Sequence, residues 1–510
     1  MDERRPLLKA LSDYASSKPI RMHMPGHKGR DTFPHVSGLD PQLRWAWEVL
    51  DQARVLDVTE CPGLDNLHYP KGCIRQVEER AKETFGSLCS YLLINGASCG
   101  IQASFMAVRM CLGEGKVILP RNTHKSAISA AVLSGLEPVW VWPEYEERYG
   151  GYLPLDSRRV TQAIKSISKD SKADEVRAVF AINPTYCGFA RELTGLAEAA
   201  HSEGAMLIVD EAHGTHFGFH RMLPKSALKC GGDVVVHGAH KTGLSFTQTG
   251  LLHVGEGAEE RFPGIVSSIE ECLRTVQSTS PSYLLMASLE QAIDVLKEND
   301  AQWVKNGVDT ALELTHRLQM IPGISVGEVD VSESSAHDLR HDPCRIFVDL
   351  RELGVSGPKA AEFLISKKAI YPEMVGPSYV VLIWTGADGQ EEMDALVSGF
   401  EDLSSEFRMG ANSPLHKYCS LGESPRPNVC MGLREAFFSP AESIPLESSD
   451  GRISADTLIT YPPGAPIIVP GEMFDSKIIN YLLEANNMGL DVLGRGIRGG
   501  DYMLSVYCVK

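Results

Sequence analysis

The sequence predicts an α/β protein with a mostly parallel central sheet, followed by smaller α+β domains. Between about residue 70 and residue 300, short β-rich runs alternate with longer amphipathic segments. Strands separated by helical patterns are typical of βαβ units, whose parallel strands are covered by helices on both faces. After residue 300 the alternation weakens, and a long helical segment precedes isolated strand-like runs.

The expected elements can be placed by residue range. Strands of the central sheet are expected at Tyr91–Ile94, Lys116–Leu119, Pro138–Val141, Ala178–Ile182, Met206–Val209 and Val234–Val236. Helices are expected at Pro6–Ala15, Gly72–Phe85, Ala97–Cys111, Thr194–Ser202, Trp303–Met320 and Gly357–Lys367, and two later strands at Arg345–Leu350 and Tyr379–Ile383. Breakers such as Asn412-Ser413-Pro414 put a boundary near residue 410. We therefore predict an N-terminal segment over residues 1–30, a large domain over 31–300, a small α+β domain over 301–410 and a C-terminal domain over 411–510.

The composition excludes several classes of protein. A formal net charge of -17 over 510 residues argues against binding to nucleic acid, whose phosphates attract basic patches. No stretch approaches the roughly 20 apolar residues of a membrane-spanning helix, and the N-terminus lacks a signal-peptide core. The 12 cysteines show neither a Cys-x-x-Cys pair nor the Cys/His spacing of a zinc site. We expect a cytoplasmic protein with mostly reduced cysteines that binds no metal, nucleic acid or membrane.

An acid and a lysine follow two of the expected strands. The apolar run Leu207–Val209 leads into Asp210, and the run Val234–Val236 is followed by His240 and Lys241. Ligands of open α/β sheets lie beyond the carboxyl ends of the strands. A lysine there can hold the aldehyde of pyridoxal phosphate (PLP) as a Schiff base, while the acid pairs with the pyridinium nitrogen. This order of residues predicts a PLP enzyme rather than a binding module.

Other polar loops also follow expected strands. Asn95–Gly100 opens a helix with small residues, so it predicts either a phosphate site at the helix N-terminus or an ordinary turn with a cap. Pro120–Ser126 contains His124, which is either a surface cap or a residue that stacks on a flat cofactor. Asn183–Tyr186 is either a turn or a place where the Asn183 side chain binds the cofactor ring oxygen.

These motifs together resemble the Orn/Lys/Arg decarboxylase family, in particular its shorter bacterial members. The resemblance covers nearly the whole chain, is weakest between about residues 300 and 450, and rests on motifs that are jointly very specific. The matching blocks are Met24–Lys28, Asp57–Glu60, Gly63–His68, Pro120–Ser126, Asn183–Gly188, Asp210–Gly214, His240–Thr242, Thr247–Gln248, Ser278–Tyr283, Gly451–Ser454 and Tyr461–Gly464. The resemblance implies the aspartate-aminotransferase fold (fold type I of PLP-dependent transferases), the cofactor PLP and decarboxylation of a basic amino acid.

The resemblance also implies a role for each matching residue. Lys241 would carry the cofactor, and Asp210 would keep the ring nitrogen protonated, so that the ring accepts electrons. Ala212 and His124 would lie on opposite faces of the ring. The donors to the ring 3-oxygen would be His213 and Asn183, and the phosphate would be bound by Ala97, Ser98 and His240. The catalytic residues would thus be Lys241, Asp210, His124 and His240.

The sequence departs from the family at one position. The family usually has a serine three residues before the lysine, where it contributes to phosphate binding, and here that position is Gly238. Losing one hydrogen bond from a hydroxyl to a charged group costs ~1.5–3 kcal/mol, which weakens cofactor binding without abolishing it. Ser280 is expected to compensate from a neighbouring subunit, since active sites of this fold lie at a dimer interface. The resemblance therefore implies a homodimer or a higher homo-oligomer.

The sequence leaves the substrate and the reaction open. A basic substrate requires an acid facing its distal cation, and Glu373 and Asp65 are the candidates, unless either is simply a solvated surface carboxylate. We favour arginine or lysine over ornithine, with the amine feeding polyamine synthesis. Because a fold does not fix a reaction, a PLP-dependent aminotransferase or another lyase is an alternative. A third alternative is a catalytically silent regulatory paralogue, which the change at Gly238 favours and the intact acid and lysine oppose.

Overall fold

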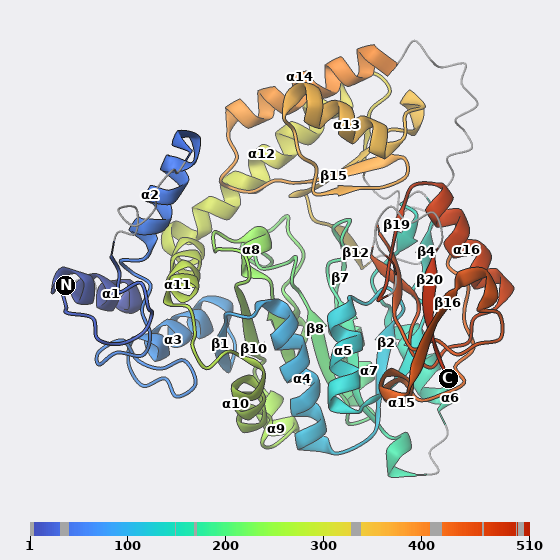
Figure 1. Cartoon of the computed structure of the whole chain (residues 1–510), viewed down its shortest axis with the longest axis horizontal. Coiled ribbons are helices and arrows are strands. Elements are labelled where there is room, and N and C mark those ends of the chain that lie inside the picture. Colours follow the sequence, from blue (N-terminus) through green and yellow to red (C-terminus); the bar gives the residue numbers. More distant parts are fainter. Residues whose placement is uncertain are drawn as a thin grey trace.

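The structure is a computed structural model that describes residues 5–30, 40–147, 149–167, 171–327, 338–407, 421–461, 464–495, 497 and 504–510. Figure 1 shows a large α/β unit, a smaller unit above it and a C-terminal unit at the right, with the N-terminal helices at the left. The predicted boundaries at residue 31 and at residues 410–411, and the breaker Asn412-Ser413-Pro414, lie outside the described residues.

The large unit is built around a seven-stranded sheet with the strand order β1-β10-β9-β8-β6-β2-β3. Its strands are β1 (Cys89–Leu93), β2 (Lys116–Pro120), β3 (Glu137–Val141), β6 (Val176–Ile182), β8 (Met206–Asp210), β9 (Val234–His237) and β10 (Gly250–Val254). β10 is antiparallel to β1 and β9, and the other neighbouring pairs are parallel. The predicted mostly parallel sheet is confirmed. The sequence does not predict β10, because Gly250 and His253 interrupt its apolar run.

Helices cover both faces of this sheet. They are α4 (Gly96–Leu112), α5 (Lys125–Ser134), α6 (Ser157–Ser166), α7 (Thr194–His201) and α10 (Ile265–Val276). α4, α5 and α10 pack on one face, against side chains such as Phe180 and Ile208. α6 and α7 pack on the other face, against side chains such as Val179 and Leu207. Because both faces of these strands are buried, polar side chains are placed at the strand ends, where the site described below forms.

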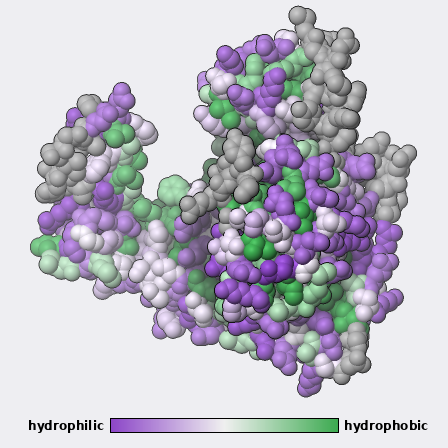
Figure 2. Space-filling model, turned by 45° about the vertical axis from the view of Figure 1, so that its right-hand side comes forward, coloured by the Kyte–Doolittle hydropathy of each residue, from purple (hydrophilic) through white to green (hydrophobic). Residues whose placement is uncertain are grey.

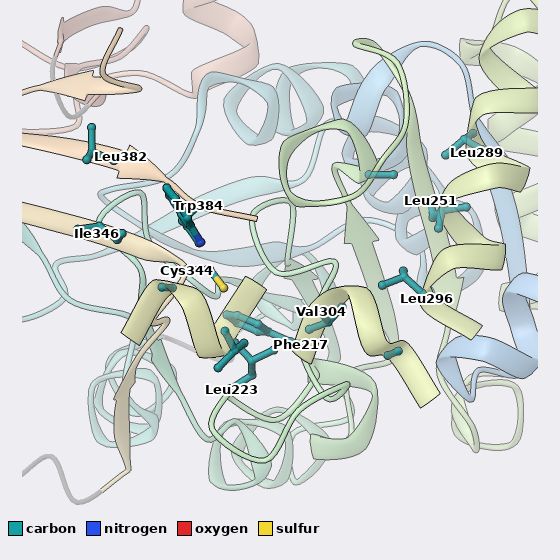
Figure 3. Packing of buried hydrophobic residues seen from close by; sticks show 14 of the residues in the cluster. Phe217, Leu223, Leu251, Leu289, Leu296, Val304, Cys344, Ile346, Leu382 and Trp384 are labelled. Atoms are coloured by element: carbon teal, nitrogen blue, oxygen red, sulfur yellow. The ribbon is translucent and has the colours of Figure 1, made fainter. Parts of the chain in front are cut away.

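A smaller antiparallel sheet with the order β11-β13-β15-β14 lies in the second unit. Its elements are β11 (Ser325–Val326), β13 (Arg345–Asp349), β14 (Met374–Val375), β15 (Tyr379–Ile383), α12 (Gln302–Gln319), α13 (Gly357–Lys368) and α14 (Gln390–Phe407). The helices and strands predicted here are confirmed. One hydrophobic cluster runs from this unit, where it includes Ile346 and Trp384, to Leu251 and Leu289 of the large unit (Figure 3). The two units therefore share a core.

A short two-stranded ribbon joins the two units beside the end of β6. It pairs β7 (Phe189–Arg191) with β12 (Leu339–His341) in antiparallel register. β7 follows the loop after β6, and β12 leads directly into β13. The ribbon therefore places the first residues of β13 next to the carboxyl ends of the large sheet.

The C-terminal unit is fixed to the edge of the large sheet by a buried ion pair. Its elements are α15 (Leu433–Phe438), β16 (Ala441–Pro445), β17 (Leu458–Tyr461), β18 (Ala465–Ile468), α16 (Ser476–Asn487), β19 (Asp491–Leu493) and β20 (Ser505–Val509). Arg121, directly after β2, donates two hydrogen bonds to the Glu472 carboxylate at 2.7 and 2.8 Å and a third to the carbonyl of Ile467. Its guanidinium also lies 5.0 Å from the ring centre of Trp140. Such bidentate contacts fix orientation as well as distance.

The N-terminal helices differ in how they contact the rest of the chain. α1 (Pro6–Ser16) packs on α3 (Cys73–Phe85) and α11 (Tyr283–Lys297), and the carboxylate of Glu290 accepts two backbone N–H bonds at its start. α2 (Arg44–Ala53) buries none of its residues and stands away from the body of the molecule (Figure 1). Figure 2 shows a deep notch between the lobe at its left and the rest of the surface. None of the described helices combines the length and apolarity that crossing a membrane requires.

Candidate active site

A cavity of about 310 Å³ lies at the carboxyl ends of the parallel strands. Its walls come from the ends of β6 and β8, the first turns of α4 and α5, the short helix α8 (Ala239–Thr242), and Gly464 and Ala465 of the C-terminal unit. Of the residues predicted for the site, it is lined by Ala97, Ser98, His124, Asp210, Ala212, His213, His240 and Lys241. This size and position are typical of a small-molecule site.

Lys241 lies in α8, one short loop after β9. Its Nζ atom is 2.9 Å from Nε2 of His213 and 5.9 Å from the centre of the Tyr186 ring. Burial lowers the pKa of Lys241 below its ordinary value, with Asp210 opposing the shift and Arg345 adding to it. The lowered pKa favours the neutral amine, which is the nucleophilic form of a lysine.

A hydrogen-bond chain runs from Arg345 through His213 to Lys241. Nη2 of Arg345 lies 2.8 Å from Nδ1 of His213. Because a guanidinium has only donors, Nδ1 must accept, and the proton of the neutral imidazole is then on Nε2. Nε2 faces Nζ of Lys241, so the lysine must offer a lone pair. The geometry therefore requires a neutral histidine and a neutral lysine.

The electrostatics of His213 agree with this assignment. Burial lowers the pKa of His213 well below its ordinary value, and the nearby Lys241 and Arg345 lower it further. The ring of Tyr186 lies 4.7 Å from the ring of His213 and covers one side of it. His213 is thus held in one orientation and one tautomer.

Asp210 is the last residue of β8 and is buried at the base of the cavity. Its Oδ1 atom accepts a hydrogen bond from the backbone N–H of Ala212 at 3.1 Å. The loop that carries Ala212 and His213 therefore folds back over the carboxylate, which leaves Asp210 beside the same cavity as Lys241. A carboxylate in this position can pair with a cationic ring nitrogen.

Two histidines of the cavity are oriented by bonds at Nδ1. His124 caps α5, and its Nδ1 accepts the backbone N–H of Ser126 at 3.2 Å. Nδ1 of His240 lies 2.7 Å from the carbonyl oxygen of Thr249, so this nitrogen must donate. Burial lowers the pKa of His124, and the charge of Asp210 opposes that shift. In both residues the Nδ1 contact fixes the ring plane.

The residues around the cavity fit PLP. α4 is a helix of 17 residues whose first turn, with Ala97 and Ser98, faces the cavity. Its first N–H groups have no partner within the helix, and they can bind a phosphate. Asp210 can pair with the ring nitrogen, and Lys241 can react with the aldehyde. Each functional group of the cofactor thus has a matching group in one cavity.

The structure explains the glycine at position 238. A Cβ atom on Gly238 would lie 2.8 Å from the carbonyl oxygen of Ala212 and 3.2 Å from Cδ of Lys241. The backbone N–H of Gly238 also donates to that carbonyl at 3.2 Å. A serine would therefore push the loop that follows Asp210 away from the loop that carries Lys241. The glycine thus permits the close approach of the loops and offers no side chain to a phosphate.

Asn183 and Asp65 are used elsewhere in the fold. The side chain of Asn183 is fully buried and does not line the cavity. It donates to the backbone carbonyl of Arg191 at 3.1 Å and accepts the backbone N–H of Arg191 at 2.7 Å. Asp65 caps α3, where its carboxylate accepts the N–H group of Gly72, just before the helix, and that of Ile74 in its first turn. Burial alone would raise the pKa of Asp65, but these backbone bonds hold it below its ordinary value. The prediction that Asp65 binds substrate is not supported, because its oxygens already bind the helix terminus.

Ser280 and Glu373 lie outside the cavity wall. Ser280 is exposed in the loop before α11, so a role in a neighbouring subunit stays a prediction. Glu373 is also exposed, in the segment before β14, yet its charge acts on residues of the cavity. Burial lowers the pKa values of Lys241 and Arg345, and the charge of Glu373 opposes that shift; it also adds to the burial that raises the pKa of Tyr461. Glu373 therefore lies at the rim of the site.

Arg345 and Tyr186 belong to the site, but no sequence motif predicts a role for either. Arg345 begins β13 in the second unit and is almost fully buried, and its Nε and Nη1 atoms have no hydrogen-bond partner. Burial raises the pKa of Tyr186 to about 12, so its hydroxyl stays protonated. A charged residue at the start of an apolar strand is the signal that could have pointed to Arg345.

Comparison with known proteins identifies the family. The model of the Orn/Lys/Arg decarboxylase major domain matches residues 5–392, and the model of the C-terminal domain matches residues 430–494. The chain belongs to the Orn/Lys/Arg decarboxylase family. The predicted enzyme class, a PLP-dependent decarboxylase, and the predicted cofactor are therefore confirmed.

Curated relatives cover almost the whole decarboxylase. An arginine decarboxylase of Bacillus subtilis is 32% identical over 490 residues, which is 96% of this chain and 95% of the relative. An arginine decarboxylase of Halalkalibacterium halodurans is 33% identical, with 96% and 95% covered. A lysine decarboxylase of Pseudomonas aeruginosa is 24% identical over 94% of this chain and 75% of the relative.

Solved structures show the same fold. The constitutive lysine decarboxylase of Escherichia coli aligns with a TM-score of 0.81 at 19% identity, covering 100% of this chain and 82% of the other. The ureidoglycine-glyoxylate aminotransferase of Bacillus subtilis aligns with a TM-score of 0.51 at 15% identity, covering 72% and 91%. The predicted fold type is confirmed, and the decarboxylase shares it with aminotransferases.

Substitutions at Arg345 test the hydrogen-bond chain of this decarboxylase. Arg345→Met removes both the donor to His213 and the nearby positive charge, so kcat/KM should fall about 10- to 100-fold, as for one charged hydrogen bond. Arg345→Gln keeps a donor but loses the charge, so it should lose less activity. Both changes raise the pKa of His213, and the acid limb of the kcat/KM profile should move to higher pH.

The matched control is Arg340→Met, on an exposed position of β12. Steady-state kinetics between about pH 5 and pH 9 provide the measurement. An acid limb that stays in place in both Arg345 variants would contradict the assigned tautomer.

Proposed function

We propose that this protein decarboxylates a basic amino acid, arginine or lysine in preference to ornithine, and that the amine product enters polyamine synthesis. The observation that carries the proposal is that Lys241 contacts His213 and lines the same cavity as Asp210, with the charge of Glu373 acting on it. Family membership and the arginine decarboxylases among the relatives support the same reaction.

The side chains divide the work of the reaction. Bound PLP supplies an electrophilic carbon for the substrate amine and an electron sink for the carboxylate bond. The Asp210 carboxylate would hold a proton at the ring nitrogen. His213 would donate from Nε2 to the ring 3-oxygen or to Nζ of Lys241. Nζ of Lys241 would take up the proton that the substrate α-amine loses on binding, and would deliver it to the substrate Cα after carbon dioxide has left. The apolar wall formed by Tyr149, Leu153 and Phe189 keeps water from that carbon.

Glu373 and two tyrosines would select the basic side chain. Glu373 acts electrostatically on Tyr186 and Tyr461, so the three groups lie in one neighbourhood. A carboxylate pairs with the distal ammonium or guanidinium of a substrate, and aromatic faces favour the same cation. Because Glu373 is exposed at the rim, it is placed for the far end of a long side chain rather than for the α-carbon.

The direct test of the reaction is product analysis. Purified protein with PLP is incubated separately with arginine, lysine and ornithine, and carbon dioxide and amine are measured together. We expect equal amounts of both products from arginine or lysine and none from the Lys241→Ala variant. A keto acid in place of carbon dioxide would show an aminotransferase. No product, with no absorbance of lysine-bound cofactor, would show a silent paralogue.

The Glu373→Gln variant tests the proposed contact with the basic group. Losing the charge at the rim should raise KM for the preferred substrate about 10-fold, which corresponds to the loss of one hydrogen bond to a charged group. The value of kcat should change little. Glu362→Gln, on an exposed position of α13, serves as the control. An unchanged KM in the Glu373 variant would remove this residue from substrate recognition.

We infer that two copies of the chain associate through the face that carries α2. Trp45, Val49 and Leu50 of this helix are 70%, 53% and 59% exposed. Exposed apolar side chains gathered on one helix mark an interaction surface. In such a dimer, Ser280 could reach the phosphate site of the neighbouring subunit, as the family resemblance implies.

A charge on α2 should weaken this association. The mass in solution, measured by light scattering during gel filtration, should fall from the dimer toward the monomer in Leu50→Glu. Met320→Glu places the same charge on an apolar position outside α2 that is even more exposed, at 73%, and should leave the mass unchanged. A monomeric wild-type protein, or a Leu50→Glu variant of unchanged mass, would refute the interface.

We also infer that the protein acts in the cytoplasm. Every cysteine that the structure describes is a free thiol, which is usual in reducing compartments. Fractionation of cells that express the protein would test this, with recovery in the cytoplasmic fraction as the expected result.

A further inference from the structure

A cluster of potential metal ligands lies apart from the active-site cavity. Among the residues that the structure describes, His216, Asp342 and Cys344 each offer a ligand atom, and these atoms lie within 4.8 Å of one another. The three residues are 3%, 0% and 5% exposed. None of them lines the cavity that holds Lys241. The mechanism proposed above does not use them.

The polar atoms of this cluster are not satisfied by hydrogen bonds. Nε2 of His216 and Oδ2 of Asp342 lie 3.0 Å apart, as in an ion pair, but the two buried atoms are not oriented as a regular hydrogen bond. Nδ1 of His216 also lacks a partner. Buried polar atoms are almost always paired. Two close ligand atoms that are not aligned as donor and acceptor are arranged as they would be around a shared ion.

There is space for a further ligand next to the cluster. A cavity of about 10 Å³ is lined by His216, Cys344 and Thr242, and by apolar residues that include Val304 and Trp384. Figure 3 shows Cys344 in the same buried layer as Val304 and Trp384. This volume is close to the minimum of roughly 10–15 Å³ that one water molecule requires. Oγ1 of Thr242, which also lines this space, has no hydrogen-bond partner.

We propose that His216, Asp342 and Cys344 bind a zinc ion, with a water molecule from the small cavity as the fourth ligand. Thiolate, imidazole and carboxylate are the ligands that zinc takes in proteins, at about 2.0–2.3 Å. Tetrahedral ligands at these lengths lie roughly 3.3–3.8 Å apart, so side-chain shifts of about 1 Å close the group onto the ion.

The ligands proposed for zinc supply two negative charges. Oδ1 of Asp342 accepts the backbone N–H of Cys344 at 2.9 Å, which leaves Oδ2 for the metal. Zinc binding breaks the S–H bond, forms a Zn–S bond and releases the proton to solvent. The carboxylate and the thiolate then neutralise the two charges of the ion.

The zinc site would connect the large unit to the unit of the small sheet, next to the contact between His213 and Arg345. His216 lies three residues after His213, and Cys344 directly precedes Arg345. An ion held by both segments would fix the separation of Arg345 and His213, and hence the tautomer of the histidine. The zinc would thus be structural and would support the hydrogen-bond chain between the two units.

Metal analysis of the intact holoenzyme tests the proposal. The protein is loaded with zinc sulfate, passed over a chelating resin and measured by plasma mass spectrometry. We expect about one zinc ion per chain, falling toward zero in Cys344→Ser and in His216→Ala. Cys272→Ser, at a cysteine of α10 that is 2% exposed, is the matched control and should keep its zinc.

Thermal unfolding provides a second readout that does not depend on activity. Zinc should raise the Tm of the wild-type holoenzyme and of Cys272→Ser, and it should not raise the Tm of Cys344→Ser. Zinc that stays bound at the same stoichiometry in both ligand variants would overturn the site. Wild-type protein that retains no zinc and shows no shift in Tm would overturn it as well.

Discussion

The active site depends on a buried guanidinium that can only donate. The guanidinium of Arg345 contains no acceptor atom, so Nδ1 of His213 must accept and the proton of His213 lies on Nε2. Nε2 then donates to Lys241, which must offer a lone pair. Arg345 belongs to the small sheet, whereas His213 and Lys241 follow strands of the large sheet. The shared hydrophobic core and the β7–β12 ribbon hold these parts together. The chemistry of the lysine is therefore set by the junction of two units.

The large sheet and the residues at its strand ends could be predicted from sequence. Six strands and the positions of Asp210, His124 and Lys241 follow from local patterns, because a strand buried on both faces is apolar and its polar residues lie at the ends. The sequence shows that a glycine at position 238 is unusual for the family, but it does not show the physical reason for that glycine. Only the folded structure shows that a Cβ there would meet the carbonyl of Ala212.

Contacts between distant segments could not be predicted. Arg345 reaches His213 through the pairing of β7 with β12, which leaves no periodic pattern in the sequence. Asp65 was a candidate for substrate binding because it is an acid within a family motif. Its carboxylate instead caps α3, and a local sequence does not distinguish these two uses of an acid. The ligands of the proposed zinc site are likewise far apart in the sequence, whereas a zinc motif is recognised by short spacings.

The protonation state of the Arg345–His213–Lys241 chain is the most direct test of this account. A neutron crystal structure of the deuterated protein without cofactor, near neutral pH, would locate the exchangeable protons. We expect a deuteron on Nε2 of His213, none on Nδ1, and two on Nζ of Lys241. A deuteron on Nδ1 of His213, or a fully charged Lys241 with three deuterons, would contradict it.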